Sequence, residues 1–168
     1  MRKIAKTLLV ILGVALVAEV AETALMVWAF RSRNPRALRL IRSFNKYVRN
    51  PVTLRFSGGS GLSATVHHVG RRSGTSYATP VIAHRSHEDV VIPLPYGTEV
   101  DWLRNVQAAG QAIVDLDGRT FRGDQPMVEG MDDVVALLPN SMVRITHLHG
   151  TRYAMRLRVA EAAAPASA

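Results

Sequence analysis

The residues with the clearest capacity for binding chemistry form a short run, Gly70-Arg71-Arg72-Ser73-Gly74, between two stretches of strand-like composition. Two guanidinium groups and a hydroxyl, flanked by flexible glycines, can wrap a phosphate through charge-assisted hydrogen bonds and backbone N–H donors. An ordinary hairpin with solvated arginines has the same spacing. The pattern by itself leaves both interpretations open.

A second run, Pro93-Leu94-Pro95-Tyr96-Gly97, ends a hydrophobic stretch. Because proline cannot donate a ladder hydrogen bond, we expect this strand to be an edge strand or to be distorted. Such a strand end leaves backbone groups free for a ligand. A plain strand terminus is the alternative interpretation.

The sequence has six histidines and no cysteine. The lack of cysteine excludes disulfides, thiolate nucleophiles, Cys-bound zinc and iron–sulfur clusters. His67 and His68 are adjacent and would face opposite ways in a strand, while His147 and His149 have no supporting carboxylate cluster. We therefore predict no metal site, and the sequence contains no P-loop, G-x-S-x-G or G-x-G-x-x-G motif.

The basic charge is concentrated at the N-terminus of the 168-residue chain. The formal net charge is +8, and residues 1–50 carry ten Lys and Arg against two acids, so residues 51–168 are neutral overall. Nucleic-acid-binding folds usually carry a basic patch on the recognition domain, whereas a charged arm beside a hydrophobic segment fits an anionic membrane surface. We predict an anionic membrane partner and no nucleic-acid partner.

Residues 7–30 form a mostly apolar segment that is long enough to span a bilayer. Glu19 and Glu22 share one helical face within it and oppose insertion. A cleaved signal peptide is the competing interpretation, but a clean A-x-A site is missing. We expect residues 1–31 to be an uncleaved anchor or interfacial helix. More Lys and Arg follow the segment than precede it, which places the rest of the chain at the cytoplasmic face of the plasma membrane.

Residues 32–50 predict a basic amphipathic helix that begins with Asn34 as N-cap and Pro35 in the first turn. Its apolar stripe consists of Leu38, Ile41, Phe44 and Val48, and its basic face carries no acid. The helix either packs on the domain with a solvated face or rests on anionic headgroups.

From residue 51 to residue 160 the pattern changes to a period of two, typical of strands. The expected strands are residues 62–69, 77–84, 89–96, 111–116, 119–128 and 153–160, with a hairpin at Asp117-Gly118. Two short helices are expected, one capped by Thr98 and ending at Gly110, the other over residues 131–138 and stopped by Pro139. This predicts a mainly β (α+β) domain over 51–160, a small antiparallel barrel or sandwich of six or so strands, followed by a disordered tail at 161–168.

Residues 66–115 resemble the deazaflavin-dependent nitroreductase family of actinobacteria, which uses coenzyme F-420. Four motifs carry the resemblance, in register: the turn at 70–74, Thr79-Pro80-Val81, the strand end at 93–97, and Trp102 with Asn105 in Asp101-Trp102-Leu103-Arg104-Asn105-Val106. The resemblance implies a split β-barrel of the flavin-reductase type.

The resemblance also implies where the cofactor binds. Its phosphate and acidic tail would be held by Arg71, Arg72, Ser73 and Gly74. The deazaflavin would lie along Thr79, Pro80, Val81, Pro93, Leu94, Tyr96 and Gly97, with Trp102 and Asn105 completing the pocket. The catalytic residue is not identified, and the candidates are Tyr96, His147 and Tyr153.

The function implied is hydride transfer from reduced F-420 to a quinone, a nitro compound or another hydrophobic activated acceptor, at the membrane. A homodimer is a possible assembly. Tyr77 stands where many members of the family carry an arginine. This keeps two alternatives open: a split barrel that binds FMN or haem, and a non-enzymatic module that binds the membrane surface.

Overall fold

The computed structural model describes residues 2–44 and 63–161. Two helices come first, α1 (Arg2–Ser32) and α2 (Pro35–Phe44). The chain turns between them at Arg33, which has a positive φ of 53°. Asn34 caps α2 as predicted, because its Oδ1 accepts hydrogen bonds from the N–H groups of Arg36 (3.0 Å) and Ala37 (3.3 Å). Residues 45–50 of the expected second helix lie outside the described residues.

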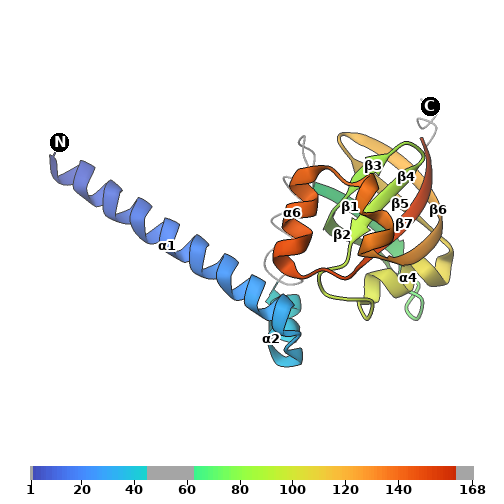
Figure 1. Cartoon of the computed structure of the whole chain (residues 1–168), viewed down its shortest axis with the longest axis horizontal. Coiled ribbons are helices and arrows are strands. Elements are labelled where there is room, and N and C mark those ends of the chain that lie inside the picture. Colours follow the sequence, from blue (N-terminus) through green and yellow to red (C-terminus); the bar gives the residue numbers. More distant parts are fainter. Residues whose placement is uncertain (1, 45–62, 162–168) are drawn as a thin grey trace.

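The rest of the described chain is one antiparallel sheet with short helices at its margins (Figure 1). The strands are β1 (Ser63–Val69), β2 (Ser76–Ile82), β3 (His84–Ser86), β4 (Asp89–Pro93), β5 (Gln111–Leu116), β6 (Arg119–Gly130) and β7 (Tyr153–Glu161). The helices are α4 (Asp101–Ala109), α5 (Met131–Val134), the 3-10 turn η2 (Val135–Leu137) and α6 (Asn140–His149).

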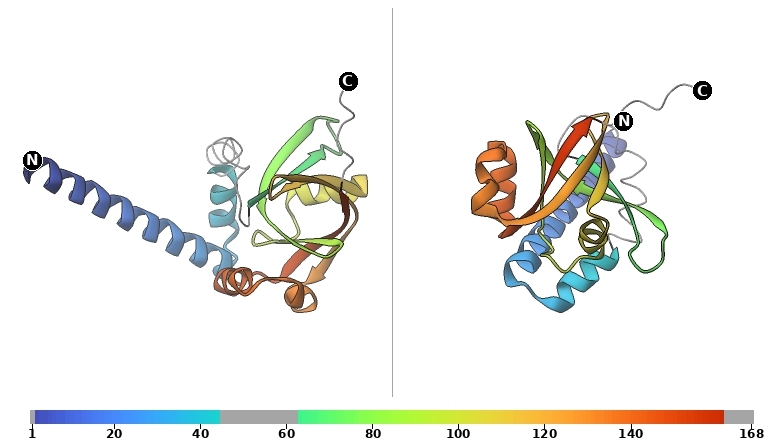
Figure 2. Two further views of the ribbon diagram at one scale, coloured as in Figure 1. Left: turned by 90° about the horizontal axis from the view of Figure 1, so that it is seen from above. Right: turned by 90° about the vertical axis from the view of Figure 1, so that its right-hand side faces the viewer.

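The sheet curls until its two ends meet. The strand order is β2-β1-β5-β6-β7-β4-β3, so the two outermost strands are consecutive in the chain. Only Ala83, 1% exposed, separates β2 from β3, so the expected strand 77–84 changes partners near its end: residues up to Ile82 pair with β1, and His84 pairs with Val91 of β4. Figure 2 shows the resulting split β-barrel, with α1 extending away from it. The expected split-barrel fold is confirmed.

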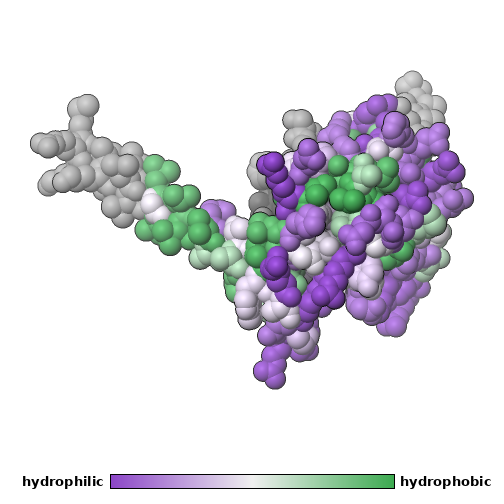
Figure 3. Space-filling view, viewed as in Figure 1, coloured by the Kyte–Doolittle hydropathy of each residue, from purple (hydrophilic) through white to green (hydrophobic). Residues whose placement is uncertain are grey.

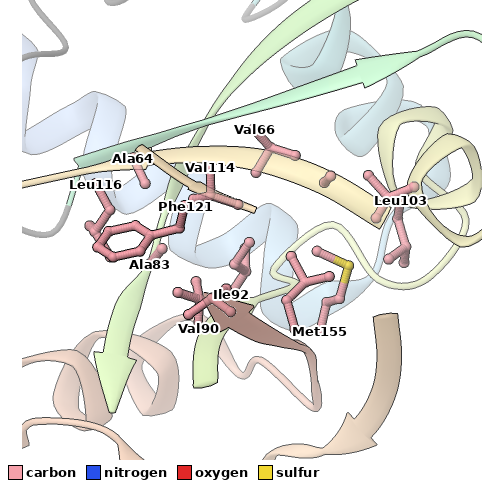
Figure 4. Close-up of a cluster of buried hydrophobic side chains, with 14 of the residues drawn as sticks. Ala64, Val66, Ala83, Val90, Ile92, Leu103, Val114, Leu116, Phe121 and Met155 are labelled. Carbon is pink, nitrogen blue, oxygen red and sulfur yellow. The ribbon is translucent and has the colours of Figure 1, made fainter. Parts of the chain in front are cut away.

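The core lies inside this curl. It includes Val66 of β1, Ile92 of β4, Leu103 of α4, Phe121 of β6 and Met155 of β7, each at most 2% exposed (Figure 4). A second cluster covers the outer face of β4 and β7, where α5 and α6 place Met131, Val134 and Met142 against Val91 and Ala154. Since β4 is buried on both faces from Val90 to Pro93, its sequence is continuously apolar over these residues.

Two sequence expectations change here. Strand β4 as a whole is not an edge strand, because it lies between β7 and β3, but its pairing with β3 stops at Val91, so at Pro93 the strand has a partner on one side only, Ala154 of β7. Thr98 does not cap α4. The N-cap is Val100, without a side-chain hydrogen bond.

Helix α6 was missed altogether. The sequence pattern around Pro139 indicates only the stop of the preceding helix, and in the structure this proline is also the N-cap position of α6. Residues 161–168 were expected to form the tail, but Glu161 is the last residue of β7. Residues 162–168 lie outside the described residues.

Candidate functional site

The turn between β1 and β2 is a tight, closed loop. The Gly70 N–H donates to the Thr75 carbonyl and the Gly74 N–H donates to the Gly70 carbonyl, both at 2.8 Å. A Cβ at position 70 would lie 2.5 Å from Ser73 Oγ and 2.9 Å from Tyr77 Cε2, so a side chain there would displace one or both of these groups. Gly74 has φ +67°, the left-handed region that favours glycine. Glycine is therefore favoured at both positions, by side-chain packing at Gly70 and by the backbone conformation at Gly74.

Arg71 is directed toward helix α4. Its Nη1 donates to Asn105 Oδ1 at 2.8 Å, its Nη2 pairs with Asp101 Oδ1 at 3.2 Å, and its backbone N–H also reaches Asn105 Oδ1 at 3.2 Å. Its side chain is 24% exposed. In this arrangement Arg71 ties the turn to the first two turns of α4.

Asn105 continues this contact into the barrel. It is 6% exposed, and its Nδ2 lies 3.2 Å from His68 Nδ1, while His68 Nε2 lies 3.1 Å from Thr79 Oγ1. An unbroken polar chain, Arg71–Asn105–His68–Thr79, therefore connects the turn, α4, β1 and β2. Burial of His68, with a smaller contribution from the neighbouring His67, lowers the pKa of the His68 imidazole below its ordinary value.

Sequence reasoning considered His68 only as a metal ligand and missed this role. The strand periodicity could have revealed it, because Ala64, Val66 and His68 alternate onto one face, and all three are buried. Among residues 2–44 and 63–161 no group of three or more His, Asp or Glu could hold a metal ion.

Tyr77 packs beside the turn. Its ring stacks on His68 with centroids 5.6 Å apart, and its hydroxyl lies 3.4 Å from Ser73 Oγ. Ser73 Oγ also accepts the Thr75 N–H at 3.3 Å. The tyrosine thus fills space against the turn, and the Ser73 hydroxyl is already used inside it.

Arg72 differs from Arg71. It is exposed, and within the described part of the chain it forms no ion pair or hydrogen bond. Of the two adjacent arginines, only Arg72 has a guanidinium that is available to an external anion.

The edge strand β2 carries three further predicted residues. Thr79, Pro80 and Val81 pair with β1 on one side, and in the described sheet no strand pairs with the other side. Pro80 suits an edge because it has no N–H to offer a further strand. Thr79 is engaged with His68, Val81 packs against the core, and Trp102 of α4 packs there as well.

The predicted strand end at 93–97 turns inward and then toward α1. Pro93 and Leu94 are buried, and the Leu94 N–H donates to the Tyr153 carbonyl at 2.9 Å. Gly97 closes a turn back to the Leu94 carbonyl at 2.9 Å, with φ +80°. Tyr96 is partly buried and its ring meets Phe30 of α1 edge-on at 4.9 Å.

His147 and Tyr153, two of the catalytic candidates, share a pocket of about 310 Å³. Its other lining residues are Met131, Asp132, Thr146, Thr151 and Arg152. The third candidate, Tyr96, does not line it and packs instead against α1. The pocket joins the start of α5, the end of α6 and the start of β7.

The strand register brings the 70–74 turn, the 93–97 strand end and the pocket with His147 and Tyr153 to one end of the barrel. Strand β1 runs toward the 70–74 turn, and its neighbour β5 begins at that end with Gln111, which pairs with Asp124 of β6. Strand β6 then continues to Gly130, which pairs with Tyr153, and Ala154 pairs with Pro93. Turn, pocket and strand end therefore lie at the same end of the sheet.

Solved structures similar to this chain include an F-420-H2-dependent reductase (TM-score 0.44, 10% identity, covering 58% of this chain and 94% of that chain). An F-420 reductase gives a TM-score of 0.39 at 15% identity, covering 63% and 92%. A proposed pyridoxamine 5′-phosphate oxidase of Listeria innocua gives 0.39 at 8% identity, covering 60% and 86%. No family model and no curated protein matches the sequence. At these scores the likeness assigns no activity to this chain.

Proposed function

We propose that this chain is a membrane-associated oxidoreductase that passes hydride from reduced coenzyme F-420 to a quinone, a nitro compound or another hydrophobic activated acceptor. The observation that carries the proposal is the closed 70–74 turn, in which Arg72 has no partner among the described residues, while Arg71, Asn105, His68 and Thr79 hold the turn against the barrel. A closed turn with an exposed arginine at the edge of a split barrel agrees with what the family resemblance implies for the phosphate site.

The residues present fit the phosphate end of such a cofactor. Arg72 would bind the phosphate by a charge-assisted contact, and the two glycines keep the backbone of the turn close to it. Arg71 would act mainly as a positioning residue, because its donors already serve Asn105 and Asp101. When bound, the reduced deazaflavin supplies a hydride, and the edge strand β2 with Thr79, Pro80 and Val81 is the proposed surface along its ring.

The strand end at 93–97 is the second proposed surface along the deazaflavin. The pocket with His147 and Tyr153, joined to that strand end by the Leu94–Tyr153 hydrogen bond, is the proposed acceptor region. The imidazole of His147 and the phenol of Tyr153 can exchange protons, which suits an acceptor that gains a proton along with hydride. Acceptor identity, membrane association and a homodimer remain predictions.

Binding of F-420 to the full-length chain in detergent tests the proposal, with FMN measured in parallel by fluorescence. We expect micromolar F-420 binding that Arg72→Ala weakens about tenfold or more, since one charge-assisted contact contributes roughly 1.5–3 kcal/mol. The matched control is Arg144→Ala, which removes an exposed arginine from α6. Loss of binding in both variants to the same degree would indicate nonspecific attraction of a polyanion.

An FMN-binding barrel is the second candidate, and a specific observation favours it. With Arg71 paired and Tyr77 in place of a cation, the described turn offers one unpaired guanidinium, which matches a monophosphate better than a long acidic tail. FMN binding without F-420 binding would establish it. Haem is disfavoured at His68, because both of its ring nitrogens have hydrogen-bond partners. A chain that binds neither flavin nor deazaflavin would leave the membrane-surface module.

A further inference from the structure

The last turn of α1 is fastened to the barrel. Ala29 and Phe30 are 0% and 4% exposed, and the Phe30 ring lies between Tyr96 (4.9 Å) and His149 (5.3 Å), edge-on to both. Such aromatic pairs are directional as well as apolar. Phe30 therefore fixes the helix to the strand end and to α6 together.

Two arginines complete this attachment. Arg31 Nη1 donates to the carbonyls of His147 (3.3 Å) and Leu148 (3.4 Å), and Arg33 Nη2 donates to the Gly150 carbonyl at 3.0 Å. These carbonyls belong to the end of α6, where the helix has unsatisfied acceptors and a negative partial charge. Phe30, Arg31 and Arg33, here called the root of α1, thus hold α6 at its C-terminus.

From Ile11 to Leu25 the described side chains of α1 are exposed, and most of them are apolar. Within Ile11–Ser32, a stretch of 18 residues has a mean hydropathy of 1.8, and none of it is buried inside the protein. Exposed residues along it include Ile11, Leu12, Val14, Leu16, Val17, Val20, Leu25 and Trp28. Figure 3 shows apolar surface along this helix, interrupted by white and purple patches. From residue 11 to residue 30 the helix is about 30 Å long, the thickness of a bilayer's hydrocarbon core. The carboxyl groups of Glu19 and Glu22 oppose insertion, and the apolar side chains favour it.

Helix α2 presents a second feature that suits lipid. Arg36 and Arg39 are exposed, and Leu40 beside them is 71% exposed, while Leu38 and Ile41 are buried. An exposed leucine among arginines is typical of a helix that rests in the headgroup layer of an anionic membrane.

We infer that the root of α1 orients the barrel, so that the end carrying the 93–97 strand end and the pocket with His147 and Tyr153 faces the anionic headgroup layer. The root contacts this end of the sheet, and the opposite end, with the β3–β4 turn at Glu88, points away. The inference rests on the proposed membrane association but not on the cofactor. Its consequence is that α1 is a fixed arm and not a flexible tether, and the pocket lies beside the lipid surface.

Because the chain has no cysteine, single labels can be placed freely. We would attach a fluorophore at Leu148→Cys, near the root and 50% exposed, or at Glu88→Cys, whose side chain is 74% exposed at the far end. The full-length chain is bound to phosphatidylcholine–phosphatidylglycerol vesicles that contain a nickel-chelating lipid as headgroup quencher. Strand β7 separates the two ends by about 16 Å between Tyr153 and Arg158, so we expect at least about twofold stronger quenching at Leu148→Cys.

The role of the root is tested in the same assay with the double variant Phe30→Ala/Arg33→Ala. In this variant the ratio of quenching at Leu148→Cys to quenching at Glu88→Cys should fall toward one. Leu25→Ala, which truncates an exposed apolar side chain of α1 outside the root, should leave this ratio unchanged. Equal quenching at both labels in the parent chain would overturn the inference, as would a root variant that keeps the full ratio. Failure of the chain to float with vesicles overturns the inference as well. Binding of F-420, measured separately, then still decides the proposed cofactor.

Discussion

Replacement of Asn105 by alanine should destabilise this protein far more than a typical helix substitution. The Asn105 side chain is 6% exposed and joins three groups: the Arg71 backbone N–H, the Arg71 guanidinium and His68 Nδ1. Asn105→Ala removes both the acceptor and the donor at the centre of this network. The Arg71 guanidinium keeps its ion pair with Asp101 and partial access to water, so the loss of its hydrogen bond to Asn105 contributes little to the change in stability.

The two remaining groups set the magnitude. A buried polar group that loses its partner costs roughly 1–3 kcal/mol. For the Arg71 N–H and His68 Nδ1 together we expect a loss of about 2–4 kcal/mol in the free energy of unfolding. For a chain of this size this corresponds to a fall in Tm of roughly 5–15 °C.

Thermal and urea unfolding of the full-length chain in detergent, followed by circular dichroism, measures this change. Gln107→Ala, an exposed position on the same helix, is the control and should stay within about 0.5 kcal/mol of the parent. If Asn105→Ala unfolds with the same free energy as Gln107→Ala, the polar network does not stabilise the fold, and our account of Arg71 as a positioning residue is wrong.

A second substitution at Asn105, to aspartate, should reverse the pH dependence that His68 gives to the stability of the parent chain. In the parent chain the folded-state pKa of His68 is lowered, so stability is lost as pH falls from the unfolded value of about 6.5 toward that lowered pKa. In Asn105→Asp a carboxylate would face His68 and raise its folded pKa. Stability should then be retained or gained as pH falls through about 6.5, and unfolding at pH 7.5 and pH 5.5 separates the two cases.

The described contacts lead to three more expected outcomes. Gly70→Ala and Gly74→Ala should both lower Tm and anion affinity, since a Cβ at position 70 would displace Ser73 Oγ and Tyr77, and a side chain at position 74 is strained at φ +67°; parallel melting and F-420 titrations measure both changes. His149→Phe should reduce the loss of Tm between pH 7 and pH 5, because burial lowers the pKa of His149 in the folded chain and the phenyl ring preserves the contact with Phe30; an unchanged slope would contradict this. Glu129→Gln should cost about 1–2 kcal/mol in urea unfolding, because it removes the 2.7 Å ion pair that, with Asp89 at 3.5 Å, holds the partly buried Arg156 between β4, β7 and β6.

The periodicity of the sequence predicted most of the barrel because local patterns decide it. The Asp117-Gly118 hairpin joins β5 and β6 as expected, and alternation along β1 matches its buried face. Periodicity did not reveal the break at Ala83 between β2 and β3, because the residue continues the apolar pattern while the chain changes partners there. A change of pairing partner is set by the curl of the whole sheet and leaves little local trace.

Helix α6 was missed for a different reason. Pro139 both ends the preceding turn and begins α6, and a proline marks a boundary without specifying whether a helix, a strand or a loop begins after it. The clues were present in Met142 and Thr146, four residues apart and both buried, and in Gly150 at the end with φ +60°. They are weak, because apolar residues of α6 are not confined to its buried side: Leu148 is 50% exposed.

The sequence predicted which residues belong to the candidate site better than it predicted the role of each one. Arg71 and Arg72 are adjacent and identical in the sequence, and no local pattern separates them. The structure does so through α4, which arrives some 30 residues later in the chain and brings Asp101 and Asn105 to Arg71 alone. Which arginine finds a partner inside the protein depends on tertiary packing. A motif of two arginines therefore suggests more positive charge for a ligand than the folded chain offers.

The same reasoning bears on Tyr77. The sequence alone makes the missing cation at this position a weakness of the site, yet in the structure the ring stacks on His68 and its hydroxyl approaches Ser73. An arginine there would bring positive charge against the buried, neutral imidazole and lower the pKa of His68 still further. Tyr77→Arg should therefore raise the affinity for an anionic cofactor and reduce stability at acidic pH together. If the affinity rises with no change in the pH dependence of Tm, the added cation points to solvent, and Tyr77 packs on His68 without influencing its charge.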